Sequence, residues 1–535
     1  MLDLRPAPAF FFPASKASRV HLRFADWIVV LLYLGGTLWL AHRARSTQGT
    51  LRDYFLADGR LSWFTSGLCL FATLFSTVSF VAIPGEAYRH GVLFSLNSIG
   101  YALFTPLAVW LFLRFFYSTS AFTAYEYLER RYDRRVRIVG AVVFLVARAL
   151  YAAIVFYSAA AIFETLLGWS PWMTIGVIGF ITIFYAFYGG MKAIALTDVM
   201  QSLIILGAVG FIVGKLIFLI HFDFAALIEA VQANGRGFGA MQEASFYSTD
   251  PKVRYSLWTA LALALIGPLT NYGTDQLFIQ RMLSTKSYDE AKKAIWLKTL
   301  VALPVSLTLY LIGLLMYFYY EHIVGQAPGV AADQLLGYFI NQHMPSPMPG
   351  LVASALLAAL MSTVSSTSAS LATVTAVDVA AFLPGVRKWR ALKSVQGGRI
   401  LTAAWGVLAI GLALVLAFAG RSVESTVLEV SQVWAGLWLI LLAVVLGGIA
   451  TTWVTARAAL LALVVGITCN LAAPYLFYYR VPMADRISFI WVGMPGFLLT
   501  GLILVVVSWF DPRKPQRLEG LTFRTAVRSG AGPAS

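Results

Sequence analysis

Charged side chains are scarce in this sequence. Asp, Glu, Lys and Arg make up 12% of the 535 residues, whereas 59% are hydrophobic and the mean hydropathy is +0.76. Because an ordinary soluble chain has about 25% charged residues, a water-soluble fold is excluded. Cysteine is also rare: Cys69 and Cys469 lie in apolar runs, which excludes a disulfide framework and a zinc site. The sequence has no Asn-x-Ser/Thr motif, which favours a bacterial inner membrane.

Long apolar runs separated by short polar loops fill the chain. About 20 apolar residues in a helix cross the hydrocarbon layer, and barrel strands would be shorter and would alternate. The sequence therefore predicts an all-α polytopic membrane protein with about thirteen transmembrane helices. The predicted spans are 27–43, 64–86, 93–116, 138–165, 171–189, 198–220, 256–280, 295–319, 351–381, 399–419, 425–447, 453–475 and 489–510.

Basic residues are spread along the loops, so the net charge of +15 indicates membrane orientation rather than binding of nucleic acid. Their distribution places the N-terminus outside and the C-terminus inside. We expect an extracytoplasmic segment at 1–26, a transporter membrane domain at 27–510 and a basic cytoplasmic tail at 511–535. The basic run 129–137 is interpreted as a topology determinant, with a cytoplasmic gate or lipid anchor as the alternative. We expect membrane lipid to surround the protein, and we expect a monomer to be the functional unit.

Two predicted spans contain residues that interrupt helices. The span 64–86 is rich in small hydroxyl residues and runs into Pro84-Gly85, and the span 256–280 carries Gly267-Pro268 with a polar stretch beyond. Interrupted backbone at membrane depth must be buried in protein or line a cavity. The two spans stand five apart, as expected for a five-plus-five inverted repeat at about 64–220 and 256–447 with its binding site at the interruptions. Plain proline kinks are the alternative.

Polar residues within other spans are candidate ligands. Ser362, Ser365 and Ser366 share a helix face in the ninth span, where their oxygens suit sodium or simply allow close helix packing. Asp198 follows Thr197 at membrane depth, as a site residue or as part of a helix N-cap. Arg148 lies deep in the fourth span and needs a partner, because a lone charge is costly there. That partner is a solute carboxylate or a protein carboxylate, unless the side chain snorkels.

Four stretches in register resemble the sodium/solute symporter family, which includes sodium-glucose, iodide, monocarboxylate, proline and sialic acid transporters. They extend from about residue 50 to 380. The stretches are Asp53 to Ala57 with Gly59 to Leu61; Phe71 to Thr73 through Pro84 to Tyr88; Tyr188 to Ala193 with Thr197, Asp198 and Gln201; and Asp275-Gln276 with Gln280-Arg281, followed by Ala358 to Ser362.

The resemblance implies a leucine-transporter-like fold and three sets of site residues. A first sodium site would use backbone oxygens of Ala72, Phe75 and Ala359 and the hydroxyls of Ser362 and Thr363. A second sodium site, present in some members, would use Asp198, Ser362, Ser365 and Ser366. The solute would contact Ser76, Ser79, Arg148 and Asn271, and Arg148 is placed similarly to an arginine that holds the substrate carboxylate in the sialic acid carriers.

The expected function is sodium-coupled import of a small organic solute by alternating access. Arg148 favours a carboxylate-bearing solute such as a sialic acid or a monocarboxylate. A sugar, polyol or amino acid is the alternative, although the sugar-transporting members of the family place other polar residues where this chain has Val78, Ser79, Pro268 and Asn271. An ion channel and a membrane-embedded enzyme are rivals from other classes. No paired carboxylates, metal-ligand spacing or nucleophile elbow supports an enzyme.

Overall fold

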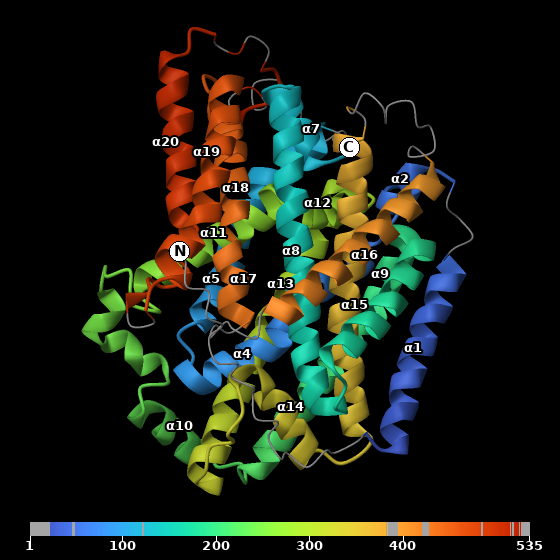
Figure 1. The fold of residues 1–535 in the computed structure, drawn as a ribbon, viewed down its shortest axis with the longest axis vertical. Coiled ribbons are helices and arrows are strands. Elements are labelled where there is room, and N and C mark those ends of the chain that lie inside the picture. The colour runs from blue at the N-terminus through green and yellow to red at the C-terminus, as the bar shows by residue number, and fades with distance from the viewer. Residues whose placement is uncertain are drawn as a thin grey trace, which may run out of the picture.

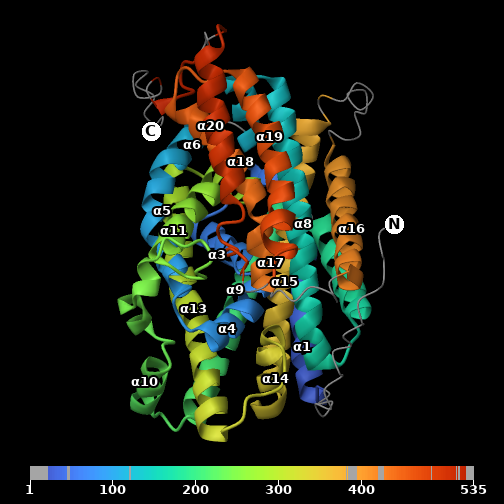
Figure 2. The same ribbon diagram turned by 60° about the vertical axis from the view of Figure 1, so that its left-hand side comes forward.

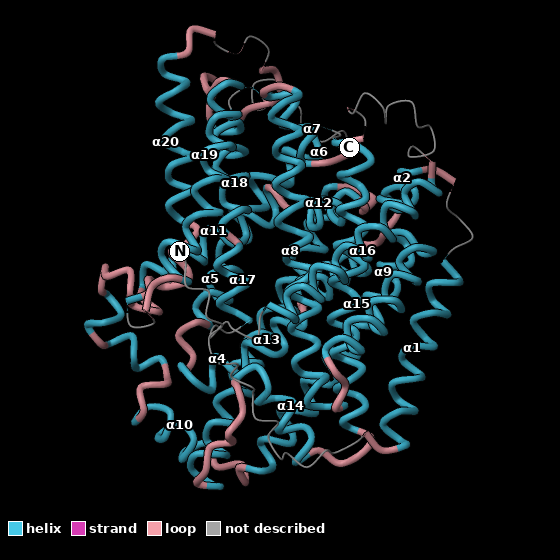
Figure 3. Tube along the Cα trace, in the orientation of Figure 1, coloured by secondary structure: helices cyan, strands magenta, loops and turns pink. Residues whose placement is uncertain are grey.

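The described part of the chain is mainly helical. In the computed structural model the described residues form helices and loops and no strand (Figure 3). The structure describes residues 22–44, 49–119, 122–380, 382, 394–419, 427–482, 485–513, 515, 518–523 and 525. The predicted N-terminal segment 1–26 and the predicted tail 511–535 lie largely outside these described residues.

Every predicted span overlaps one helix or an adjacent pair (Figure 1). The helices are α1 (Phe24–Ala44), α2 (Leu51–Leu56), α3 (Trp63–Leu74), α4 (Thr77–His90), α5 (Ser95–Ala108), α6 (Arg114–Thr119), α7 (Ala124–Arg131), α8 (Arg134–Leu167), α9 (Pro171–Leu219), α10 (Phe224–Ala233), α11 (Leu257–Gly273), α12 (Gln276–Leu283), α13 (Tyr288–Phe318), α14 (Ala332–His343), α15 (Met348–Val374), α16 (Val395–Ala419), α17 (Val427–Trp434), α18 (Gly436–Ala450), α19 (Ala456–Pro474) and α20 (Met494–Phe510).

The helix α9 holds two predicted spans, 171–189 and 198–220. Its 49 residues are interrupted at Gly190, whose φ of 56° and ψ of −170° are not helical. A residue other than glycine would be strained at this positive φ. In the described part of the chain, nine helices are long and apolar enough to cross a membrane, or ten when the bent pair α3–α4 counts as one span. The total of thirteen crossings and the inverted repeat stay predictions.

The helix α15 forms the centre of the molecule. Every residue from Val352 to Val374 is buried, because α1, α3, α8, α9 and α16 surround the helix. The small side chains of this segment let neighbouring backbones approach closely. In Figures 1 and 2, α19 and α20 run side by side at one edge, and α1 lies at the opposite edge in Figure 1.

The helix α13 packs against both α3 and α4. A Cβ atom added at Gly67 of α3 would lie 2.8 Å from the Leu297 side chain and 3.0 Å from the Ala294 carbonyl oxygen. A Cβ atom at Gly313 of α13 would collide with the carbonyl oxygen of Pro84 in α4. Glycine is therefore required at both contacts, one on each side of the bend between α3 and α4.

Candidate ion and solute site

The predicted break in the span 64–86 lies between α3 and α4, whose axes differ by 57°. Helical dihedrals end at Phe75 (φ −84°, ψ 86°) and Ser76 (φ −90°, ψ 169°). The Ser76 amide donates to the Leu74 carbonyl rather than to Ala72, four residues earlier. The Ala72 carbonyl oxygen therefore lacks its usual helical donor and can take another partner. Pro84 stays inside α4 and does not cause the break.

Hydroxyl groups of α15 reach this freed carbonyl. The Ser362 hydroxyl donates to the Ala72 carbonyl oxygen at 2.9 Å and is 3.2 Å from the Ala359 carbonyl oxygen, to which Thr363 also donates at 2.9 Å. These four residues are at most 1% exposed. Phe75, the fifth predicted residue of the first sodium site, is the C-cap of α3 at the break. The structure thus brings four of the five predicted ligand residues together at the junction of α3 and α15, and places Phe75 at the adjacent break.

The residues of the predicted second sodium site are only partly joined. Asp198 is fully buried on α9; its Oδ2 accepts from the Cys69 thiol at 2.9 Å, while its Oδ1 has no hydrogen-bond partner in the described residues. The hydroxyl of Ser365 bonds the Ser362 carbonyl at 3.2 Å, and that of Ser366 bonds Thr73 at 3.3 Å. The described hydrogen bonds thus join Asp198 to α3 and Ser366 to α3, but none of them joins Asp198 to the serines. The second site stays a prediction.

A buried arginine lies on the other side of the Cys69 thiol from Asp198, a placement that the sequence did not reveal. Arg281 of α12 is fully buried and donates from Nε to the Cys69 sulfur at 3.2 Å and from Nη1 to the Leu277 carbonyl at 2.7 Å. The Cys69 thiol therefore lies between a carboxylate and a guanidinium. The pair Gln280-Arg281 was noted only as a family motif, and nothing in its spacing indicated a contact with Cys69 in the second span.

The second interruption lies beyond the predicted position. α11 continues through Gly267 and Pro268 and ends at Gly273; Asp275 then caps α12 by accepting the Leu277 amide at 3.0 Å. A proline inside a helix removes one hydrogen bond, whereas an aspartate N-cap begins a new helix. The expectation that Gly267-Pro268 interrupts this span is therefore wrong, although the span is interrupted.

A cavity of about 390 Å³ lies beside both interruptions. Three of the four residues predicted to contact the solute line it: Ser79, Arg148 and Asn271. Ser76 is instead joined to the lining through the hydroxyl of Tyr151, which donates to the Ser76 hydroxyl at 3.2 Å. The structure thus gathers the predicted solute residues in or next to one space.

Arg148 is already paired within the protein. Its guanidinium forms an ion pair with Asp275, and both side chains are less than one tenth exposed. The rings of Trp438 and Tyr151 lie 4.7 and 5.3 Å from the guanidinium carbon. Of the partners considered for Arg148, a protein carboxylate is the one that the structure shows. Its contact with a solute carboxylate stays a prediction.

Lys298 is a further cation in the lining, and the sequence analysis gave it no role. It lies on α13, is 1% exposed, donates to the Tyr272 hydroxyl at 3.2 Å and lies 4.1 Å from the centre of the Tyr101 ring. Asn271 in turn donates to the Tyr101 hydroxyl at 3.0 Å. A signal was available: Lys298, Ala302, Ser306 and Tyr310 recur every four residues on α13, and all line the cavity.

Glu86, Arg254 and Glu429 form a network that we call the Arg254 clamp. Arg254 precedes α11 and binds both carboxylate oxygens of Glu86 on α4, at 3.0 and 3.1 Å, and Glu429 on α17 at 2.7 Å. The residues Ile83 and Leu428, close to the two glutamates in the chain, line the cavity. The clamp therefore joins three chain segments at one end of the cavity, which the predicted topology places on the outer side.

Opening of this end is expected to depend on the Arg254 clamp. Arg254→Gln removes the charge that holds the two buried carboxylates together, so a cysteine introduced as Ser431→Cys in the cavity lining should react about tenfold faster with a membrane-impermeant maleimide. The matched control is Lys252→Gln, which removes only the exposed ion pair with Asp485. Equal labelling rates in the Arg254→Gln and Lys252→Gln backgrounds would rule out a gating role for the clamp.

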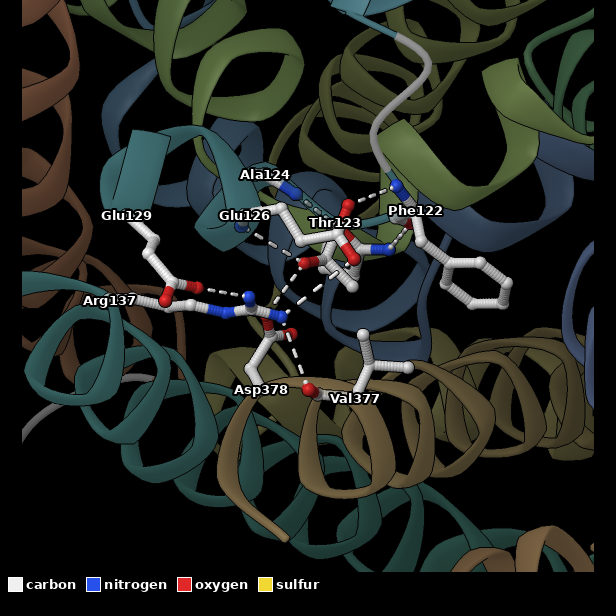
Figure 4. A network of polar contacts seen from close by, with 9 residues as sticks. Phe122, Thr123, Ala124, Glu126, Glu129, Arg137, Val377 and Asp378 are labelled. Atoms are coloured by element: carbon white, nitrogen blue, oxygen red, sulfur yellow. Dashed lines mark hydrogen bonds and ion pairs between the residues drawn. The ribbon is translucent and has the colours of Figure 1, made fainter. Parts of the chain in front are cut away.

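A second network lies at the end of the bundle that is predicted to face the cytoplasm. Figure 4 shows Arg137 of α8 between Glu129 of α7, at 2.5 Å, and the fully buried Asp378, at 2.8 Å. Thr123 donates to the same carboxylate oxygen of Asp378 at 2.8 Å. Arg137 belongs to the basic run 129–137. Besides any effect on topology, this run therefore joins α7 and α8 to the segment Thr375–Val379 that follows α15.

Residues 54–466 match the sodium:solute symporter family, as the sequence motifs predicted. The chain belongs to the sodium:solute symporter family. Sodium is the coupling ion of this family, whose members are multi-pass membrane transporters. The predicted family and helical membrane fold are confirmed, whereas the ligand residues of the ion and solute sites stay predictions.

Two named relatives and a solved structure are similar to this chain. A putative sodium-dependent multivitamin transporter of Drosophila melanogaster is 28% identical over 406 residues, which cover 74% of this chain and 66% of the relative, just under two thirds of its length. Human sodium-coupled monocarboxylate transporter 2 is 28% identical over 441 residues, covering 81% of this chain and 69% of that protein. A solved Na+-coupled sialic acid symporter, substrate-bound and outward-open, gives a TM-score of 0.79 at 22% identity, covering 92% of this chain and 100% of that one. This last similarity establishes the fold.

Proposed function

We propose that the protein is a sodium-coupled symporter that imports a small organic solute bearing a carboxylate. The observation that carries the proposal is the oxygen cluster of Ala72, Ala359, Ser362 and Thr363, placed where a broken helix meets α15 beside the cavity. Neutral hydroxyl and carbonyl oxygens are ligands that suit a hard cation such as sodium. Oxygens this close repel one another unless a proton or a cation lies between them. A bound sodium ion would lie between these oxygens where hydroxyl protons now lie.

The cavity supports a small anionic solute. Its volume of about 390 Å³ lies in the range of sites for small organic molecules. Among the described residues, the charged ones in its lining are Arg148, Asp275 and Lys298, two cations and one carboxylate, so one positive charge is left uncompensated among them. Relatives that carry monocarboxylates and vitamins by their names, and a sialic acid symporter of the same fold, are consistent with a carboxylate-bearing cargo.

The energetics of coupling favour two sodium ions for such a cargo. One charge moved through 100 mV releases about 2.3 kcal/mol, and a tenfold sodium gradient adds about 1.4 kcal/mol. For a monoanion and one sodium ion the two voltage contributions cancel. A second ion at Asp198 would restore the electrical drive, and the Oδ1 of this buried carboxylate, which has no hydrogen-bond partner in the described part of the chain, supports binding there.

Alternating access follows from ligand linkage. Sodium at the junction of α3 and α15 would fix the break at Phe75 and Ser76, and with it the solute-facing side of α4. Ion and solute then stabilise the same closed state, so each raises the affinity for the other. Rocking of one group of helices against the other would expose the cavity to the opposite side. The Arg254 clamp and the Arg137 network lie at the two ends that must open in turn.

The proposal predicts that a carboxylate solute stabilises the purified protein only when sodium is present. Melting temperatures are measured with pyruvate, N-acetylneuraminate or lactate, each in sodium and in choline buffer, since a ligand that binds only the native state adds about 2.7 kcal/mol at 100 times its Kd. Uptake into proteoliposomes under a sodium gradient completes the test. Stabilisation by glucose but by none of the carboxylates would replace the proposal with the sugar alternative.

A further inference from the structure

We propose that Lys298 binds the anionic group of the solute, in a subsite formed by α5, α11 and α13. This inference rests on the proposed function, which it extends from a substrate class to a residue that selects that class. Lys298 lies on the face of α13 that repeats every four residues along the cavity, and its ammonium group is held between Tyr101 of α5 and Tyr272 of α11.

The charge of Lys298 has no carboxylate partner within the described residues. Its described polar contacts are the Tyr272 hydroxyl at 3.2 Å and the face of the Tyr101 ring at 4.1 Å. Hydroxyl and cation–π contacts offset only part of the cost of burying an ammonium group, which is high at membrane depth. An anion that enters the cavity offsets much of the remainder, because a charge-assisted hydrogen bond replaces lost water.

The ammonium group also has donors to offer. It carries three N–H groups, and one is used by the Tyr272 hydroxyl. The neighbouring Asn271 and Tyr101 are joined by a hydrogen bond of 3.0 Å, so the side chains around the ammonium are held in position. A carboxylate bound here would meet a charged donor on a rigid polar wall formed by three helices.

Arg148 is the competing candidate, but its guanidinium already faces a carboxylate. The Arg148–Asp275 pair is neutral as a unit, and a solute anion that bound Arg148 would have to displace Asp275. Lys298 has no such competitor. The two cations therefore have different roles: Arg148 holds α8 to the start of α12, and Lys298 attracts the solute.

Lys298→Met tests this assignment because methionine keeps the length of the side chain and removes its charge. Affinities of the full-length protein for pyruvate, N-acetylneuraminate, their methyl esters and iodide are measured in sodium buffer. We expect the affinity for the free acids to fall about 10- to 100-fold, the range given by 1.5–3 kcal/mol for a hydrogen bond to a charged group. The affinity for the methyl esters should change less than about threefold, and Lys298→Arg should retain binding of the acids.

The controls separate a binding role from a structural one. Lys293→Met lies on the same helix but changes an exposed lysine, and should leave every affinity unchanged. The ligand-free Lys298→Met protein should melt no lower than wild type, since an uncompensated buried charge is removed; Lys298→Gln provides the same test if the methionine variant does not fold. Equal loss of affinity for acids and esters would make Lys298 structural and overturn the inference.

The affinity measurements with iodide distinguish failure of this inference from failure of the proposed function. If the wild type binds iodide but none of the acids, and Lys298→Met loses iodide, the anion subsite stands and the carboxylate cargo is wrong. If the wild type binds the acids and Lys298→Met binds them equally well, the cargo stands and the subsite is wrong. If the wild type binds neither acids nor iodide, both are wrong.

Discussion

Ser362→Ala is expected to abolish sodium-dependent uptake while the protein still folds and inserts. The Ser362 hydroxyl is the contact between the freed Ala72 carbonyl of α3 and the Ala359 carbonyl of α15. If one ligand oxygen contributes about 1.5–3 kcal/mol to the binding free energy of sodium, its loss lowers the sodium affinity about 10- to 100-fold. Solute binding should weaken with it, because the two are linked. The measurements are uptake into proteoliposomes and the increase in melting temperature on addition of sodium.

Ser370→Ala is the matched control. Ser370 is equally buried on α15, eight residues further on, but its hydroxyl bonds the Thr367 carbonyl of its own helix at 2.9 Å. This variant should retain sodium-dependent uptake and the sodium-induced increase in melting temperature. If Ser362→Ala behaves like Ser370→Ala in both assays, the oxygens at the α3–α15 junction do not bind the ion.

Arg148→Met is expected to lower the free energy of unfolding by about 3–5 kcal/mol, the cost of leaving one member of a buried ion pair without its partner. Asp275 is 2% exposed and would keep an uncompensated negative charge at membrane depth. Asp275→Asn preserves the cap at the start of α12, because asparagine also caps helices, while it removes the charge. The double variant should therefore be more stable than Arg148→Met alone. Chemical denaturation of the four proteins in detergent gives the coupling energy.

The same variants decide between two roles for Arg148. If the main role of Arg148 is the ion pair with Asp275, the Arg148→Met variant loses both uptake and stability, and the sodium-induced increase in its melting temperature persists. A variant of unchanged stability that no longer binds pyruvate or N-acetylneuraminate would instead assign the solute carboxylate to Arg148, as the sequence predicted. In that case Asp275→Asn should raise the affinity for these acids, because the guanidinium would no longer be occupied by Asp275.

The serine face of the candidate ion site could be predicted because its signals are local, whereas its other proposed ligands came from the family resemblance alone. Hydroxyl residues three and four apart on an apolar helix define a face, and Ser362 lies on the side of α15 that meets α3. The break in the span 64–86 was also predictable, since small hydroxyl residues accumulate there. Its exact position was not, because Pro84 is the stronger local signal and the helix accommodates it.

The partners of the charged residues in the cavity could not be assigned from local signals. Arg148 was recognised as needing a partner, but Asp275 lies 127 positions away and follows no periodicity that joins it to α8. Lys298 lies near the start of a predicted span, where a lysine commonly reaches toward the membrane surface. Only the packing of α5, α11 and α13 shows that its ammonium group lies between two tyrosine side chains.

The two glycine contacts of α13 limit how the transporter can move. Through Gly67 and Gly313 this helix is fitted against both arms of the bent α3–α4 pair, so the angle between the arms cannot change without separating one contact. We therefore expect the three helices to shift as one block that carries Lys298 and one wall of the cavity. Ser362 and Thr363 belong to a different helix, so the proposed ion ligands would lie on both sides of the boundary between this block and α15. A cation bound there would fasten the block to α15 until it departs.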